Sequence, residues 1–146
     1  MKSLIAALFL ILSAATSAHA ADVVGRWKTI DDETGKAKSI VQIFSDAGEI
    51  KGKIVKLINP DPKRLNCTKC KGPRKNKPIV GMEILWGMKK KKDDEWKGGE
   101  ILDPKNGKTY SCRLRLKDDG KKLEVRGYIG FSLFGRSQMW LREKAD

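Results

Sequence analysis

The cysteines are the residues of this chain with the clearest capacity for chemistry, and two of them stand three positions apart. Cys67 and Cys70 could form half of a zinc site, a thioredoxin-type redox pair or a local disulfide. A zinc ribbon needs a second pair, and only Cys112 remains. A redox pair needs a helix after its first cysteine, which the following Gly72-Pro73 disfavours. We favour a disulfide, with a redox or metal role as the alternative.

Histidine and paired carboxylates are the other obvious sources of acid–base chemistry. The one histidine, His19, lies in an N-terminal segment that we expect to be removed. The mature chain would then lack Ser-His-Asp triads, Cys-His pairs and histidine metal ligands. Turn formation explains the three pairs of adjacent aspartates, Asp31-Asp32, Asp93-Asp94 and Asp118-Asp119. We therefore predict no catalytic residues, no metal site and no cofactor.

Residues 1–20 have the pattern of a signal peptide. Lys2 supplies a positive charge, residues 4–12 are apolar, and Ala18-His19-Ala20 is a small-x-small cleavage site. The apolar stretch is shorter than the about 20 residues of a membrane-spanning helix, and we expect no transmembrane segment later in the sequence. We expect cleavage after Ala20, one mature domain over residues 21–146, and an exported protein that is periplasmic or secreted.

Alternation of apolar and polar residues is the main structural signal, and it is clearest between Gly98 and Arg142. Tyr110, Cys112 and Leu114 alternate with serine and arginine, a period of two that gathers apolar side chains on one face. Similar runs between turns rich in glycine and aspartate predict eight strands, over residues 24–30, 38–44, 49–57, 79–88, 95–102, 108–116, 122–128 and 136–142.

Eight short strands joined mostly by tight turns predict an all-β fold, a single antiparallel up-and-down barrel, with a two-sheet sandwich as the alternative. Residues 59–78 are the exception, a long basic loop that contains the cysteine pair. The side chains expected to face the interior are Met82, Ile84, Trp86, Tyr110, Leu114 and Val125. Such residues can fill a small barrel or line a cavity for one ligand. Cys112, in the same row, is expected to be a buried free thiol.

The first predicted strand contains Gly25-Arg26-Trp27, which resembles the Gly-x-Trp signature of lipocalins and other calycins. That resemblance implies that Trp27 closes one end of the barrel and that a late arginine packs across its ring. Arg142 is the matching candidate and Arg136 the second. The other lipocalin motifs and the C-terminal helix are absent from the sequence, so the implied kinship is one of architecture.

Longer blocks of sequence resemble a family of exported bacterial proteins, domain of unknown function 2147 (DUF2147). The blocks are Gly25-Arg26-Trp27 and residues 67–78, 81–87, 99–110 and 125–140. The resemblance covers nearly the whole mature chain and implies a calycin-like (lipocalin-like) barrel exported to the periplasm or beyond. It implies no established activity.

The net charge of the chain indicates which classes of partner it is expected to bind. The formal net charge is +13, or +12 after removal of the leader with Lys2. So basic an exported protein is expected to associate with anionic surfaces of the cell envelope. Aromatic residues are not interleaved with the lysines in a stacking pattern, so we predict no specific nucleic-acid binding.

Together these features predict a non-enzymatic protein that binds a small apolar or amphipathic ligand in its barrel. Trp86, Tyr110, Met82 and Leu114 are the predicted ligand-binding residues, and the basic loop with Lys69 and Arg74 is the predicted rim. The alternative is a basic accessory protein that binds anionic envelope surfaces without a cavity ligand. An enzyme that uses the cysteine pair is a third possibility.

Overall fold

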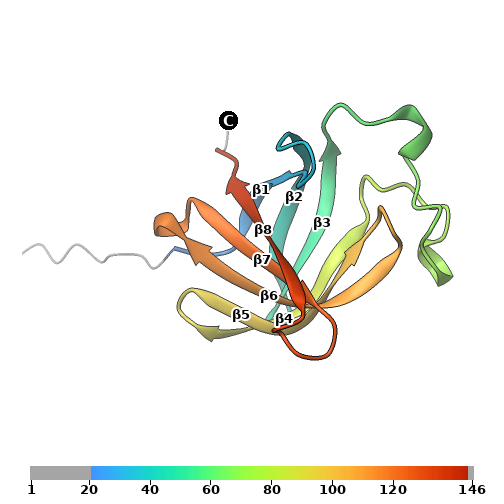
Figure 1. Ribbon diagram of the computed structural model, residues 1–146. Coiled ribbons are helices and arrows are strands. Elements are labelled where there is room, and N and C mark those ends of the chain that lie inside the picture. The colour runs from blue at the N-terminus through green and yellow to red at the C-terminus, as the bar shows by residue number, and fades with distance from the viewer. Residues whose placement is uncertain (1–20, 145–146) are drawn as a thin grey trace, which may run out of the picture.

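Eight antiparallel strands close into one barrel in the computed structural model, which describes residues 21–144. The predicted signal peptide lies outside the described residues. The strands are β1 (Gly25–Ile30), β2 (Ala37–Asp46), β3 (Glu49–Leu57), β4 (Glu83–Lys92), β5 (Glu95–Asp103), β6 (Lys108–Lys117), β7 (Lys122–Tyr128) and β8 (Gly135–Arg142). Each strand pairs with the next, and β8 returns to β1 (Figure 1). The predicted all-β, up-and-down barrel is confirmed.

The interior is filled by the alternating apolar side chains of β6 and β7 and their neighbours. Cys112 and Leu114 are fully buried on β6, and Leu123 and Val125 are buried opposite them on β7. Leu114 pairs with Val125 across the two strands, so the two face the same side of the sheet. The period-two prediction for this part of the chain is therefore confirmed.

The predicted fourth strand is wrong in both its bounds and its inward face. β4 begins four residues later than predicted and includes Lys89–Lys92, which lie outside the predicted strand. Leu85 and Met88 are the fully buried residues of this strand, although three positions separate them. Gly87 lies between them with φ +70°, a left-handed conformation that interrupts the alternation. Of the predicted inward row, Trp86 therefore lies on the outer wall, whereas Met82 and Ile84 are buried and belong to the core.

The connections of an up-and-down barrel alternate between its two ends. The first end, here called the N-terminal end, carries residues 21–24 and the turns β2–β3, β4–β5 and β6–β7. The other end, here called the loop end, carries the turns β1–β2 and β5–β6, the long β3–β4 connection and the β7–β8 link (residues 129–134). In Figure 1 the long connection stands out in green at the right, away from the N-terminal residues.

The long β3–β4 connection is tied together by a disulfide between Cys67 and Cys70, as the sequence predicted. It contains two short 3-10 helices, Pro62–Arg64 and Gly72–Arg74. The Arg74 guanidinium lies 4.6 Å from the Trp86 ring centroid, and the Cys67 sulfur lies 3.5 Å from the carbonyl oxygen of Pro104. The connection therefore packs on the outer wall of the barrel. Residues 21–144 include no helix long and apolar enough to cross a membrane.

A charged cluster joins β5 and β6 on the outer wall. The Glu95 side chain is only 1% exposed, and it sits opposite Arg115 in the strand pairing. The Arg115 guanidinium donates two hydrogen bonds to its carboxylate, and the Lys97 ammonium lies 3.0 Å away. Chiefly because of the Arg115 hydrogen bonds, and against the opposing effect of burial, the pKa of Glu95 falls to about 2.

Replacement of Glu95 by glutamine is therefore expected to destabilise the protein in a pH-dependent way. At pH 7 the variant leaves Arg115 without its carboxylate and should lose about 1–3 kcal/mol of unfolding free energy. The ionised wild-type carboxylate stabilises the fold above its ordinary pKa of 4.5, and that contribution disappears as the pH falls toward 2. Urea denaturation of both proteins at pH 7 and pH 2.5 checks this, and an equal gap at both pH values would contradict it.

Candidate functional site

The N-terminal end of the barrel is closed by the indole of Trp27. This side chain is fully buried, and its Nε1 donates a 2.8 Å hydrogen bond to the carbonyl oxygen of Val23. The Arg142 guanidinium lies over the ring, 4.2 Å from its centroid, and Trp27 and Arg142 are also partners in the β1–β8 pairing. The second candidate, Arg136, lies at the loop end, 3.4 Å from the Asp32 carboxylate.

Arg142 also ties three segments of this end together. Its Nε donates to Gly120 O at 2.6 Å, Nη1 to Val24 O at 3.1 Å, and Nη2 to Asp22 O. Gly25 explains the glycine of the Gly-x-Trp motif, because its φ is +140° and a Cβ there would lie 2.8 Å from Arg142 Nη1. The N-terminal residues are thereby held across the mouth of the barrel.

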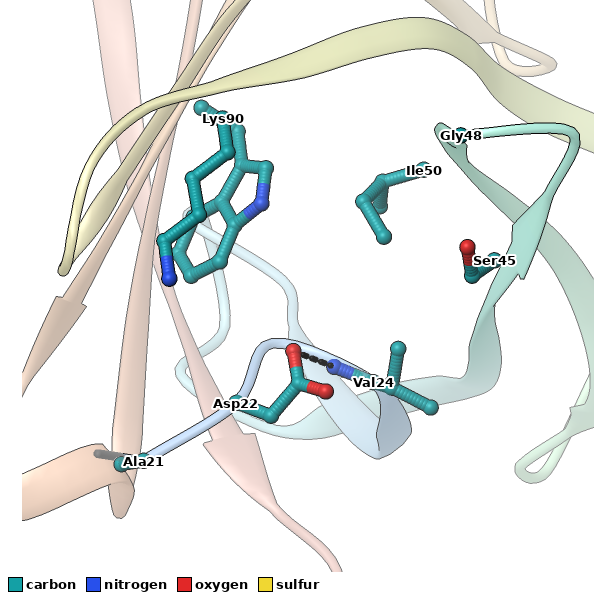
Figure 2. A pocket seen from close by; sticks show the side chains of 8 residues that line it. Ala21, Asp22, Val24, Ser45, Gly48, Ile50 and Lys90 are labelled. Atoms are coloured by element: carbon teal, nitrogen blue, oxygen red, sulfur yellow. Dashed lines mark hydrogen bonds between the residues drawn. The ribbon is translucent and has the colours of Figure 1, made fainter. Parts of the chain in front are cut away.

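A hollow of about 360 Å³ lies beside these residues at the N-terminal end. Its lining combines the N-terminal crossing, the β2–β3 turn and the adjoining parts of β3, β4 and β5: Ala21, Asp22, Val24, Ser45, Gly48, Ile50, Lys90 and Trp96. Figure 2 shows the Lys90 side chain alongside an indole, with Ile50 and Val24 on the facing sides. The volume falls within the range of small-molecule sites, roughly 300–1,000 Å³.

The hollow is amphipathic. Ile50 and Trp96 are 8% and 3% exposed and contribute a small apolar patch, and the Lys90 ammonium lies 5.9 Å from the Trp96 ring centroid. Lys90 is half exposed, and within the described residues its ion-pair partner is Asp93, at 3.9 Å. The Asp22 carboxylate has a hydrogen-bond partner in the same segment, because its Oδ1 accepts a 3.3 Å hydrogen bond from the Val24 amide. Such a site can take an apolar group against the indole and an anionic group at the lysine.

A second hollow, of about 240 Å³, brings together two of the aspartate pairs that we expected only in separate turns. Asp93-Asp94 and Asp118-Asp119 share it with Ala21. Asp118 lies 2.8 Å from the Lys122 ammonium, whose hydrogen bond lowers the pKa of this carboxylate. A general acid needs a raised pKa, so Asp118 does not have the character of a general acid.

The four predicted ligand-binding residues do not surround one cavity. Leu114 lies in the filled interior, and Tyr110 lies half-buried toward the loop end, where its hydroxyl accepts a 2.9 Å hydrogen bond from Asn106 Nδ2. Trp86 lies on the outer wall, where its Nε1 donates to the exposed Glu100 at 3.0 Å. Met82 is buried directly before β4. The inward placement of Trp86 was wrong because Gly87 changes the phase of the strand.

The residues of the hollow had no distinctive signal in the sequence. Lys90 belongs to a run of four lysines, Lys89–Lys92, that falls between two predicted strands. Strand pairing places Lys90 opposite Trp96, and only the register reveals that neighbourhood. Trp96, two residues after the Asp93-Asp94 turn, is the one residue of the hollow whose type could have suggested a binding site.

The remaining cysteine, Cys112, carries a free thiol and is fully buried. Burial raises the pKa of this thiol to about 12, so it is neither a nucleophile nor a metal ligand at neutral pH. Within residues 21–144, no three side chains of the metal-ligating types come together.

Sequence comparison decides the family. Residues 25–142 match the family described as "Uncharacterized protein conserved in bacteria (DUF2147)". This chain belongs to the DUF2147 family. The family match spans all eight strands, from the glycine of the Gly-x-Trp motif to Arg142. Among curated proteins, no sequence matches this chain.

One solved structure shows the same architecture. Protein HP1028 from the human pathogen Helicobacter pylori, which is described as belonging to the lipocalin family, superposes with a TM-score of 0.75. The two share 21% identity over 85% of this chain and 84% of the other. A redesigned β-barrel aligns with a TM-score of 0.45 and 15% identity over 84% of this chain and 91% of its own. The first likeness shows a lipocalin-like fold for this member of DUF2147.

Proposed function

We propose that this DUF2147 protein is a non-enzymatic binding protein, exported to the periplasm or beyond, that takes up a small amphipathic molecule with an anionic head. The hollow at the N-terminal end carries the proposal, because it combines buried apolar surface with one lysine at its rim. The proposed site lies at the opposite end of the barrel from the predicted basic rim.

The chemistry of the lining selects the ligand class. An apolar tail against Ile50 and Trp96 would gain roughly 25 cal/mol per Å² of surface removed from water. A carboxylate or phosphate at the Lys90 ammonium would add an ion pair of at most about 1 kcal/mol, because that side chain is 55% exposed. Binding should therefore depend mainly on the tail, while the head group sets the preference for acids over alcohols.

Decanoate and decanol are suitable probes because they differ only in the head group. We expect saturable binding of decanoate, detected by calorimetry or by a change in tryptophan fluorescence, to which Trp96 contributes. Lys90→Gln should weaken decanoate binding about fivefold, the equivalent of about 1 kcal/mol, and should leave decanol binding unchanged. Moderate salt should weaken decanoate binding without abolishing it.

The neighbouring lysine supplies a matched control. Lys91→Gln removes the same charge from the same strand, but Lys91 does not line the hollow. It should leave decanoate affinity unchanged, as should Trp86→Ala on the outer wall. If the two lysine variants weakened decanoate binding equally, the effect would come from the overall charge and not from a contact with Lys90. Linear, unsaturable uptake of decanoate would rule out the site.

A further inference from the structure

The β7–β8 link is the most exposed apolar segment among the described residues. Ile129, Phe131, Leu133 and Phe134 are 69%, 79%, 81% and 72% exposed. They follow one another within six residues at the loop end, and in Figure 1 the link projects as a loop at the lower edge of the barrel. So large an exposed apolar group on a soluble surface marks an interaction site.

The backbone of the link is held in one conformation by hydrogen bonds, so its exposed side chains are presented in a fixed arrangement. The Arg126 guanidinium donates from Nε to Ser132 O at 2.7 Å, from Nη2 to Leu133 O at 3.4 Å, and from Nη1 to Ser137 Oγ at 3.1 Å. The Phe134 amide also donates to Phe131 O at 3.0 Å. These bonds satisfy the backbone while the apolar side chains stay turned to solvent.

We propose that the link inserts into the surface of an anionic lipid bilayer and docks the loop end of the barrel on it. Its four large side chains contain no hydrogen-bonding atoms, whereas protein interfaces depend on Trp, Tyr and Arg anchors with polar groups. The link projects from the barrel, as insertion requires, and Phe and Leu are typical of such interfacial contacts.

Charge complementarity favours an anionic bilayer. The whole chain has a net charge of +13. At the loop end, the acidic side chains Asp32 and Glu33 are already paired with Arg136 at 3.4 Å and Lys105 at 3.3 Å. The long connection at the same end adds basic side chains with one acidic residue, Asp61, among them: Lys63, Arg64, Lys69, Lys71, Arg74, Lys75 and Lys77. Basic groups near inserted apolar residues strengthen attachment to anionic headgroups.

This docking goes beyond the proposed ligand binding and is independent of it, because the hollow lies at the other end of the barrel. A fluorescent probe can test it selectively. Cys67 and Cys70 are bonded to each other and Cys112 is buried, so a cysteine introduced at Ser132 can be labelled alone. Labelled Ser132→Cys protein should show a blue-shifted, brighter emission with vesicles of equal parts phosphatidylglycerol and phosphatidylcholine. The same label at Lys91→Cys, at the N-terminal end, should not respond.

Vesicle sedimentation gives the affinity. The double variant Phe131→Ser and Phe134→Ser should bind the mixed vesicles at least about tenfold more weakly than wild type, because two exposed phenyl groups no longer enter the bilayer. Met139→Ser, which removes a 40% exposed side chain from the β8 wall, should bind as wild type does. Vesicles of pure phosphatidylcholine should bind the wild type more weakly.

Three results would overturn the proposal. One is a label at position 132 that does not respond to vesicles, and another is equal vesicle affinity of wild type and the double variant. The third is lipid-free self-association that the double variant abolishes, since this would assign the link to a contact between copies of the chain. Lys90→Gln should bind vesicles as wild type does, because Lys90 lies at the N-terminal end of the barrel.

Discussion

Replacing Trp27 with alanine is expected to lower the free energy of unfolding by about 3–5 kcal/mol, the range for the loss of a large buried aromatic side chain. The indole is fully buried and fills the end of the barrel between Val23 and Arg142. Its removal leaves a cavity that the surrounding strands cannot close, because both β1 neighbours hold the backbone in place. Equilibrium denaturation in urea measures the loss.

Trp86→Ala is the matched control for this experiment, because it removes the same side chain from the outer wall. It should cost clearly less, since Trp86 is only half-buried and its loss leaves no enclosed cavity. Arg142→Lys tests the packing of the guanidinium on the indole separately, because lysine keeps the charge but replaces three planar nitrogens, each bonded to a different carbonyl group, by one compact ammonium. A Trp27→Ala protein as stable as wild type would show that this end of the barrel is not closed by the indole.

Replacing Gly99 with alanine is expected to cost about 3 kcal/mol, the upper part of the range for an overpacked core. A Cβ at this position would lie 2.6 Å from the Met88 sulfur and 2.7 Å from the carbonyl carbon of Gly87, and still nearer to the Trp86 carbonyl oxygen. Two of these three atoms are backbone of the adjacent strand β4. A shift that relieved the contact would therefore separate β4 from β5.

The neighbouring Gly98 distinguishes this clash from simple backbone strain. Gly98 has φ +83° and open space around its Cβ position, so Gly98→Ala should cost only about 1–2 kcal/mol for a left-handed alanine. Thermal and urea denaturation of the two single variants compare the effects directly. Equal losses would mean that the β4–β5 contact yields to an added methyl group.

The fold was predictable because its signals are local. Strand periodicity between Tyr110 and Val125 and the glycine-rich turns need no knowledge of distant residues. The prediction for β4 failed at Gly87, where one left-handed residue reverses which side chains face inward, and the sequence alone does not reveal the φ of a glycine. Trp86 was therefore assigned to the interior although it lies on the outer wall.

The candidate site was not predictable, because it is assembled from segments that are far apart in the sequence. Val24 and Ser45 lie far in the sequence from the paired residues Lys90 and Trp96, and the fold of the barrel brings all four to one end. The Arg115 bonds that lower the pKa of Glu95 likewise depend on the register of β5 against β6. Local patterns reveal which residues are buried, whereas the register decides which of them are neighbours.

The pairing of β1 with β8 has a consequence for how the molecule folds. Every other strand pairing joins strands that are consecutive in the sequence, and tight β-hairpins form within about 1–10 μs. The β1–β8 seam joins opposite ends of the chain through the pairs Trp27–Arg142 and Lys28–Leu141, so it bears the largest loop-closure entropy. Until Arg142 is in place, the chain is an open sheet with two unpaired edges, and such edges recruit other chains. Pairing of the last strand residues with β1 therefore removes the edges that favour aggregation, and it also places Arg142 over Trp27.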